Sequence, residues 1–247
     1  MLLAIDIGNT NISCGLFEGL KLTRRFDIPT KTPFKARFLK KLGDLSKISD
    51  TLICSVVPRQ TTVVSGILTA LTGKTPYIIG KDAIVPIKNL YHKPKQVGQD
   101  RLVNAYAASL LYPPPLIIID SGTAVTFDVI SKKAEYLGGL IAPGMEASLK
   151  ALKEKTALLP EVRLSSPKAL IGKDTKNSIL SGIVFGAADL CSGIVRRIKA
   201  KIGKNTLIIG TGGNISLIKK YSKLDIKIDK ELTLKGINFI YKHEIKR

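Results

Sequence analysis

Apolar residues along the chain gather in short runs that end in turn-forming residues. Two runs, over residues 3–5 and 117–119, each lead into an aspartate, one further residue and a glycine. A second extended segment follows each of them, over 12–17 and 125–130. Extended runs separated by glycine and small polar residues are typical of β-hairpins. The pattern therefore predicts one hairpin at the N-terminus and another near the middle of the chain.

Longer segments around these hairpins predict helices. Residues 101–111 combine a broad apolar face with several alanines, and both features favour a helix. Residues 138–144 contain three glycines and predict a turn that leads into a helix. Strands that alternate with helices indicate an α/β fold with mixed sheets. We expect further helices over 61–71, 144–158, 178–197 and 232–241, another after residue 213, and strands over 50–57, 76–79 and 206–209.

The two hairpins also form an internal repeat. Asp6-Ile7-Gly8-Asn9-Thr10 and Asp120-Ser121-Gly122-Thr123-Ala124 share the pattern aspartate, any residue, glycine, polar residue, small residue, almost half the chain apart. A repeat this long indicates two related domains rather than a solenoid. Pro113–Pro115 cannot continue the preceding helix, because proline fixes φ and lacks a backbone N–H. We therefore expect domains over residues 1–112 and 113–247.

Composition narrows the function classes. Of the 247 residues, 45% are hydrophobic, enough to form a core and to exclude intrinsic disorder. The net charge of +20 would suit nucleic acid. The basic residues are scattered, however, and aromatic residues make up only 6%, so no stacking surface is evident, although dispersed residues could assemble into a patch. We expect no nucleic-acid partner.

The sequence also predicts a cytoplasmic protein. The longest uninterrupted apolar runs are too short to span a bilayer, and Asp6 interrupts the N-terminal run before a signal peptide could form. The two histidines are far apart and predict no histidine metal site. The odd number of widely spaced cysteines predicts reduced, packed thiols at Cys14, Cys54 and Cys191.

The repeated turns carry chemistry that suits a phosphate and a cation. In the first turn Asp6 could orient hydrated Mg²⁺, and a glycine backbone can approach an anion closely. Either turn alone is more often an ordinary hairpin turn, but two at corresponding points favour a phosphate site. Gly210–Gly213 could lie against a base or ribose, or could simply connect a strand to a helix tightly. The candidate phosphate donors of the first turn are Gly8, Asn9, Thr10, Asn11 and Ser13.

A further candidate is the helix that begins near Asp100. The Asp100 carboxylate is a candidate base for an attacking hydroxyl, and Arg101 is a candidate partner for a phosphate or carboxylate group. The alternative is an acid that only stabilises the helix start, where the helix dipole should also hold the carboxylate ionised and weakly basic. Over 175–178 we expect one residue to act as a helix N-cap.

Together these motifs resemble the sugar kinase, heat-shock chaperone and actin superfamily, and within it the type III pantothenate kinase family. Asp6–Thr10 resembles the first phosphate motif, Asp120–Ala124 the second and Gly210–Gly213 the adenosine turn. Gly98–Arg101 matches a Gly-x-Asp-Arg signature, and Gly139–Gly144 matches a glycine-rich Pro-Gly segment. The resemblance implies an actin-like ATPase fold made of two duplicated ribonuclease H-like domains with mixed sheets.

The resemblance also implies an activity and a set of site residues. The activity is ATP-dependent phosphorylation of pantothenate to 4′-phosphopantothenate, the first step of coenzyme A biosynthesis. Asp100 would be the general base, Asp6 would lie by the ATP phosphates and Mg²⁺, and Asp120 would coordinate K⁺ or NH₄⁺. The implied ATP contacts are Asp6, Ile7, Gly8, Asn9, Thr10, Asn11, Ile12, Ser13, Thr123, Gly212 and Gly213. The implied pantothenate contacts are Tyr91, Gly98, Gln99, Asp100, Arg101 and Thr175.

The family resemblance further implies a homodimer with the substrate site near its interface. Two alternatives stay open: a non-catalytic accessory factor linked to transcription, and a kinase of the same fold that acts on another small hydroxyl compound. The joint presence of Asp6, Asp100 and Asp120 argues against a site that has lost its chemistry. The chain shows two modest departures from the family pattern: Gln99 occupies the variable signature position, and Lys93-Pro94 stands where many members have Asn-Pro. Both departures concern the fine substrate contacts.

Overall fold

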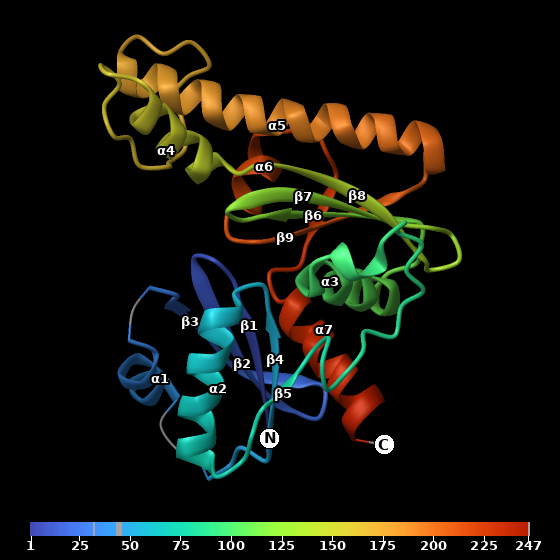
Figure 1. Cartoon of the computed structure of the whole chain (residues 1–247). Helices are drawn as coiled ribbons and strands as arrows, with labels where there is room; N and C mark the ends of the chain where they lie inside the picture. Colours follow the sequence, from blue (N-terminus) through green and yellow to red (C-terminus); the bar gives the residue numbers. More distant parts are fainter. Residues whose placement is uncertain (32, 43–45, 247) are drawn as a thin grey trace. The chain divides into compact units, whose positions relative to one another are not determined.

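A computed structural model describes residues 1–31, 33–42 and 46–246 (Figure 1). The chain divides into two compact units, Met1–Leu111 with Glu231–Arg247, and Tyr112–Lys230. The division after Leu111 lies next to the three prolines. The C-terminal segment, which the sequence predicted as part of the second domain, packs instead with the first unit.

The first unit is built on a five-stranded mixed sheet. Its strands are β1 (Leu2–Ile7), β2 (Asn11–Glu18), β3 (Lys21–Pro29), β4 (Asp50–Ser55) and β5 (Tyr77–Ile78), in the order β3-β2-β1-β4-β5. Strand β2 pairs antiparallel with β1 and β3, while β4 pairs parallel with β1 and β5. The predicted N-terminal hairpin is therefore confirmed as β1–β2.

Helices α1 (Phe34–Leu42) and α2 (Pro58–Thr72) cover one face of this sheet. Their buried side chains share a core cluster with alternate residues of β1, as the strand period of two requires. The cluster contains Leu3, Ile5, Ile7, Phe34, Phe38, Val64 and Leu68.

Helices α3 (Gln99–Leu111) and α7 (Leu232–Ile240) belong to the other side of the first sheet. A Cβ on Gly15, which points away from the α1–α2 cluster, would lie 3.2 Å from Leu234 of α7. The two helices also approach closely, because a Cβ on Gly236 would lie 2.6 Å from Val103 Cγ1. This packing assigns the C-terminal helix to the first unit. Short helical turns occupy Pro94–Gln96 and Tyr241–Ile245.

The second unit repeats the sheet of the first. Its strands are β6 (Leu116–Ser121), β7 (Ala124–Ile130), β8 (Tyr136–Pro143), β9 (Leu207–Thr211) and β10 (Ile226–Ile228), in the order β10-β9-β6-β7-β8. Strand β7 pairs antiparallel with β6 and β8, while β9 pairs parallel with β6 and β10. The second hairpin is confirmed as β6–β7, and each strand has a counterpart in the first sheet.

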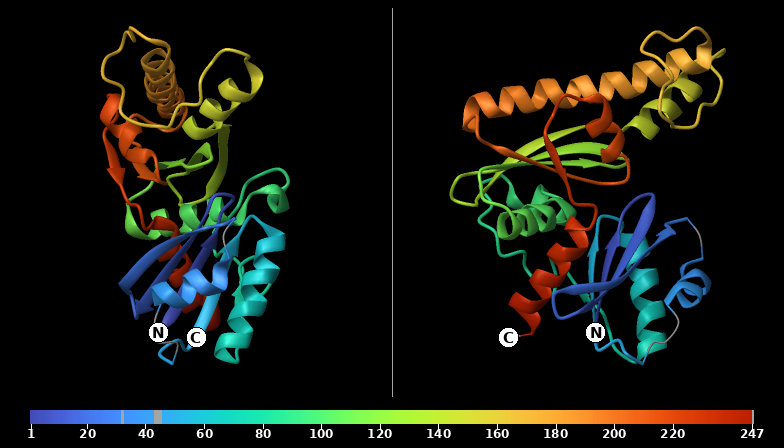
Figure 2. Two further views of the ribbon diagram at one scale, coloured as in Figure 1. Left: turned by 90° about the vertical axis from the view of Figure 1, so that its left-hand side faces the viewer. Right: turned by 180° about the vertical axis from the view of Figure 1, so that it is seen from behind.

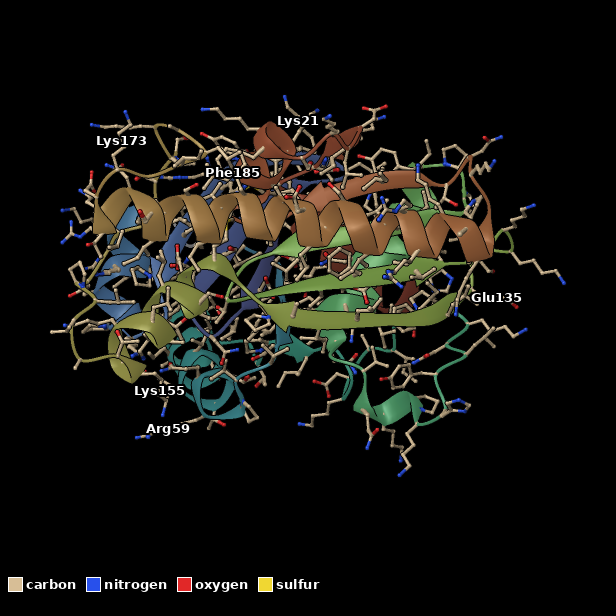
Figure 3. All side chains as sticks on the ribbon, turned by 90° about the horizontal axis from the view of Figure 1, so that it is seen from above. Lys21, Arg59, Glu135, Lys155, Lys173 and Phe185 are labelled. Atoms are coloured by element: carbon tan, nitrogen blue, oxygen red, sulfur yellow. The ribbon has the colours of Figure 1, made fainter. Side chains whose placement is uncertain are left out.

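Helices α5 (Thr175–Ile202) and α6 (Ile215–Tyr221) pack on the second sheet, and α4 (Met145–Lys155) packs against the first turns of α5 (Figure 2). Helix α5 spans 28 residues and extends beyond its predicted range at both ends. It is long and apolar enough to cross a membrane by length and composition. One face of it lies in the core of the second unit, with Val184, Cys191 and Val195. Figure 3 shows α5 running along the sheet, with Phe185 on it.

The structure corrects two local predictions and adds three elements that the sequence did not predict. Residues 138–144 do not form a turn: Tyr136–Pro143 is the edge strand β8, which hydrogen bonds with β7 give an extended conformation despite its glycines. The N-cap of α5 is Asp174, one residue before the predicted segment, and it accepts a hydrogen bond of 2.9 Å from the Asn177 N–H. Strands β3 and β10 and helix α1 were not predicted, because short or strongly basic segments show little periodicity.

Candidate active site

The first candidate phosphate turn joins β1 to β2. The Gly8 N–H donates to the Asn11 carbonyl at 2.9 Å and closes the turn, so that this N–H is already engaged. Asn9, Thr10 and Asn11 are exposed. The turn therefore presents the polar groups of three consecutive residues to solvent.

Thr30, directly after β3, holds this turn from the neighbouring strand. Its hydroxyl donates to the Gly8 carbonyl at 2.8 Å, and its N–H donates to the Thr10 carbonyl at 2.9 Å. The Thr30 residue is only 5% exposed. Sequence reasoning missed Thr30, because nothing local marks a residue that acts across two strands.

The remaining predicted ATP contacts of the first turn differ in character. The side chains of Ile7 and Ile12 are fully buried in the core, so only their backbone atoms can face a ligand. The Ser13 hydroxyl donates to Asp27 Oδ1 at 2.6 Å. We therefore expect these three residues to shape the turn more than to touch the nucleotide with their side chains.

Two carboxylates of the first unit influence the same buried thiol. Asp6 pairs with Cys54 in the parallel β1–β4 ladder. The pKa of Cys54 is raised well above its usual value, first by burial and then by the negative charges of Asp6 and Asp100. Both carboxylates are thus close enough to Cys54, in β4, to act on it electrostatically.

Asp100 lies in the first turn of α3, as predicted, but its electrostatics differ from the prediction. Burial raises its pKa above the usual 3.8, and the hydrogen bond from the Arg101 N–H and the Arg101 charge oppose this only in part. The expectation of a weakly basic carboxylate was therefore wrong, because loss of hydration outweighs the favourable helix start. A carboxylate with a raised pKa is a better proton acceptor.

The start of α3 also brings together the rest of the signature. A Cβ on Gly98 would lie 2.5 Å from Asp100 Oδ1. Gln99 packs against Gly80: a Cβ on Gly80 would lie 3.0 Å from Gln99 Cδ, and the φ of +89° at Gly80 also favours glycine. Arg101 is 8% exposed. Tyr91 lies on the preceding loop, where its N–H donates to Asn89 Oδ1 at 3.0 Å.

The second candidate turn, between β6 and β7, is held by two segments distant in sequence. The Gly122 N–H donates to the Ala124 carbonyl at 2.9 Å and closes the turn. From one side the Gly144 N–H donates to the Thr123 carbonyl at 3.1 Å, and from another the Asn214 N–H donates to the Ser121 carbonyl at 3.0 Å. The glycine-rich segment before α4 and the turn after β9 therefore converge on the second turn.

Asp120, near the end of β6, lies beside this second turn and against Gly212. A Cβ on Gly212, which has a φ of +88°, would collide with Asp120 Oδ1 and lie 2.6 Å from the Ser121 carbonyl oxygen. A glycine is thus required here for its conformation and for its lack of a side chain. Thr175, by contrast, is exposed at the start of α5.

Comparison with known proteins decides the family. The profile described as type III pantothenate kinase matches residues 2–197. A type III pantothenate kinase of Dehalococcoides mccartyi (strain ATCC BAA-2100) is 37% identical over 97% of this chain and 95% of its own length. That of Geotalea daltonii is 38% identical over 98% of both chains. The chain belongs to the type III pantothenate kinase family. It is therefore a kinase that uses ATP and an alcohol acceptor.

Solved structures show the same fold at low identity. A Baf family transcriptional activator from Campylobacter jejuni aligns with a TM-score of 0.62 at 20% identity, over 99% of this chain and 100% of that one. The activator of 2-hydroxyisocaproyl-CoA dehydratase from Clostridium difficile, with bound ADPNP, aligns with a TM-score of 0.60 at 13% identity, over 99% and 96%. The predicted actin-like ATPase fold is confirmed.

The candidate carboxylates of this kinase suit a cation that the protein and the nucleotide bind together. Among the residues that the structure describes, no group of three or more histidine, cysteine or acidic side chains could hold a metal ion. Mg²⁺ in kinases is usually bound by one or two carboxylates together with substrate phosphates and water. Asp6, with a single carboxylate at a strand end, has the donor chemistry for this mode.

We expect Thr30→Val to raise KM for ATP, because it removes a hydrogen bond that holds the first turn in place. The change leaves the Gly8 carbonyl without its buried donor, which should lower the free energy of unfolding by about 1–2 kcal/mol and raise KM for ATP several-fold. Urea denaturation and steady-state kinetics would measure both effects.

Thr23→Val is the matched control, because the Thr23 hydroxyl also donates from β3 to a β2 carbonyl, that of Leu16, at 3.1 Å. It should lower stability without changing KM for ATP. Equal KM values in the two variants would contradict a role for Thr30 in the turn.

Proposed function

We propose that this kinase transfers the γ-phosphoryl group of ATP to the primary hydroxyl of pantothenate, forming 4′-phosphopantothenate and ADP in the first step of coenzyme A biosynthesis. The observation that carries the proposal is the half-buried carboxylate of Asp100 at the start of α3, within the family's Gly-x-Asp-Arg signature. Relatives that match the chain over nearly its full length bear the name of this activity, which supports the same substrate here.

In the proposed reaction, the hydroxyl oxygen of pantothenate attacks the γ-phosphorus as the bond to the β–γ bridging oxygen breaks. Asp100 accepts the hydroxyl proton, and its raised pKa suits this role. Phosphoryl transfer has a loose transition state, so the enzyme mainly positions the reactants and stabilises their charge. Arg101 and the exposed polar groups of the first turn would supply that stabilisation, while Mg²⁺ bound with ATP would neutralise phosphate charge.

We also infer that a monovalent cation, K⁺ or NH₄⁺, binds at Asp120. The support is the packing of this carboxylate against Gly212 and beside the carbonyl-rich second turn, since hard cations prefer oxygen ligands. A cytoplasmic location agrees with free, buried thiols at all three cysteines.

A homodimer is the proposed assembly, and α5 is the proposed interface. Only 33% of the most apolar window of this helix is buried inside the chain. A Cβ on Gly182, Gly186 or Gly193 would meet no atom within 4 Å. Leu190, on the same helix, is 40% exposed. The exposed side of α5 thus combines these glycines with Leu190 and with the charged Asp189. Glycines let a second helix approach closely, so a second copy of the chain would pack against this side.

We expect Gly186→Glu to convert the dimer into a monomer, because it places a long charged side chain where the glycines would let the second helix approach. Gly66→Glu is the matched control: Gly66 also lies within a helix, α2, with open space around its Cβ position. Light scattering coupled to size-exclusion chromatography would measure the mass of each. A wild-type monomer, or a Gly186→Glu dimer, would contradict the proposed interface.

The activity is tested with purified protein, ATP and pantothenate, in buffers that contain K⁺, NH₄⁺ or only Na⁺. We expect 4′-phosphopantothenate by mass spectrometry, with faster turnover in K⁺ or NH₄⁺. Folded protein that binds ATP but leaves pantothenate unchanged would point to another hydroxyl acceptor, and absence of ATP binding would refute the kinase proposal.

A further inference from the structure

The carboxylate of Asp100 is folded back onto the start of its own helix. Its Oδ1 accepts a hydrogen bond of 2.9 Å from the Arg101 N–H. The same N–H lies 3.1 Å from the Gly98 carbonyl oxygen. Because one carboxylate oxygen is held by the backbone, the direction of the other oxygen is set as well.

Gly98 occupies the N-cap position of α3, where a capping side chain is often found. It immediately precedes α3, and its carbonyl accepts from the Leu102 N–H at 3.3 Å, as the residue before a helix does. Serine, threonine, aspartate, asparagine and glycine are all preferred there, and the first four also cap the free N–H groups of the first turn with a side-chain oxygen. The chain has no such cap at this position.

Backbone conformation does not explain the glycine. Gly98 is not among the glycines with positive φ, so a residue with a side chain could adopt its backbone angles. What a side chain would meet is the base itself: a Cβ on Gly98 would lie 2.5 Å from Asp100 Oδ1 and 3.6 Å from its Cγ. The next nearest atom, Val56 Cγ1, would be at an ordinary 3.8 Å.

We propose that Gly98 is a positioning residue, whose missing side chain lets the Asp100 carboxylate keep its folded-back orientation at the helix start. The proposal rests on the proposed function, in which Asp100 accepts the hydroxyl proton. It assigns the glycine of the signature a role in orienting the base, separate from any contact with substrate.

Gly98→Ala should therefore reduce activity while leaving the fold intact. The atom that must move is the end of a flexible side chain, so the clash is relieved by rotation of the carboxylate and little stability is lost. A displacement of about 1 Å at a reacting group reduces turnover by up to about 100-fold. We expect kcat to fall by about 10- to 100-fold, with an unchanged KM for ATP and only a slightly lower melting temperature, because alanine is a poorer N-cap residue than glycine.

A double-mutant cycle separates positioning from a general structural effect. If Gly98 acts through Asp100, Gly98→Ala should lower kcat in the wild-type background and have no further effect in Asp100→Asn. Gly66→Ala, in open space on α2, is the control and should leave kcat unchanged. Equal losses in both backgrounds, or no loss in the wild type, would overturn the proposal.

A crystal structure of Gly98→Ala tests the geometry independently of activity. We expect the Asp100 carboxylate to have left the Arg101 N–H. A carboxylate in its original place would overturn the positioning role even if pantothenate is the substrate. A wild-type enzyme that does not phosphorylate pantothenate would refute the proposed function, and a carboxylate displaced in the variant would still support the orienting role of Gly98.

Discussion

Asp100→Asn is expected to lower kcat by about 10²- to 10⁴-fold, the range that a positioned general base contributes. Asparagine keeps the shape of the side chain but cannot accept the hydroxyl proton. Because the substituted atom is not needed to bind the nucleotide phosphates, KM for ATP should change little. Steady-state kinetics with ATP and pantothenate would measure both constants, and near-normal turnover would refute Asp100 as the base.

The same substitution should not destabilise the protein. Burial raises the pKa of Asp100 in the folded state above its usual 3.8, so the folded chain binds this proton more tightly than the unfolded chain does. Ionisation of Asp100 therefore opposes folding, and its contribution to stability falls as pH rises from 3.8 through the folded-state pKa. Asparagine removes this ionisation. At neutral pH we expect Asp100→Asn to unfold at the same or a higher urea concentration than the wild type, and a lower midpoint would contradict the raised pKa.

Gly144→Ala is expected to have the second largest effect, through the turn between β6 and β7, the candidate second phosphate turn. A Cβ at this position would collide with the Gly122 carbonyl oxygen and lie 2.5 Å from that of Thr123. These are backbone atoms, so the turn itself must move. Its φ of −76° and ψ of 163° are allowed to alanine, so the effect is steric rather than conformational.

We expect kcat/KM for ATP to fall by about 100-fold in this variant, with a loss of about 1–3 kcal/mol in the free energy of unfolding from overpacking. Steady-state kinetics and urea denaturation would measure the two effects. Gly66→Ala is again the control, since alanine within a helix should leave activity unchanged and stabilise the fold slightly. A Gly144→Ala enzyme with wild-type kcat/KM would show that the second turn does not position ATP.

The two variants test the two units of the chain separately. Asp100 belongs to the first unit, and Gly144 to the second. Asp100→Asn should alter the chemical step, whereas Gly144→Ala should alter the use of ATP. If both variants lost kcat alone, the assignment of the second turn to the nucleotide would be wrong.

Much of the fold was predictable because its signals are local. The hairpins β1–β2 and β6–β7 each follow from an apolar run, a glycine turn and a second run. Helix α3 follows from its apolar face, and the proline run ends it at Leu111. The repeated Asp-x-Gly pattern also predicted two related halves, and the two sheets share one strand order. These features depend on residues that are neighbours in sequence.

Other features required the tertiary structure. Strand β8 is extended because β7 supplies its hydrogen bonds, although its own glycines indicated a turn. Helix α7 joins the first unit because Gly236 permits close packing against Val103 of α3. Val103 lies far from Gly236 in the sequence, so no local pattern could predict that packing, and in β8 the pairing with β7 overrides the local turn signal of the glycines.

The sequence by itself determined the family and marked the two Asp-x-Gly turns and the candidate base, because each is written in a short motif. Only the tertiary structure decided the burial, the pKa and the packing partners of these motifs. It raised the pKa of Asp100 by removing water, and it placed Thr30 against the first turn and Gly144 against the second. Burial and close packing depend on segments far apart in the chain, and these contacts set the geometry and basicity that the proposed chemistry needs.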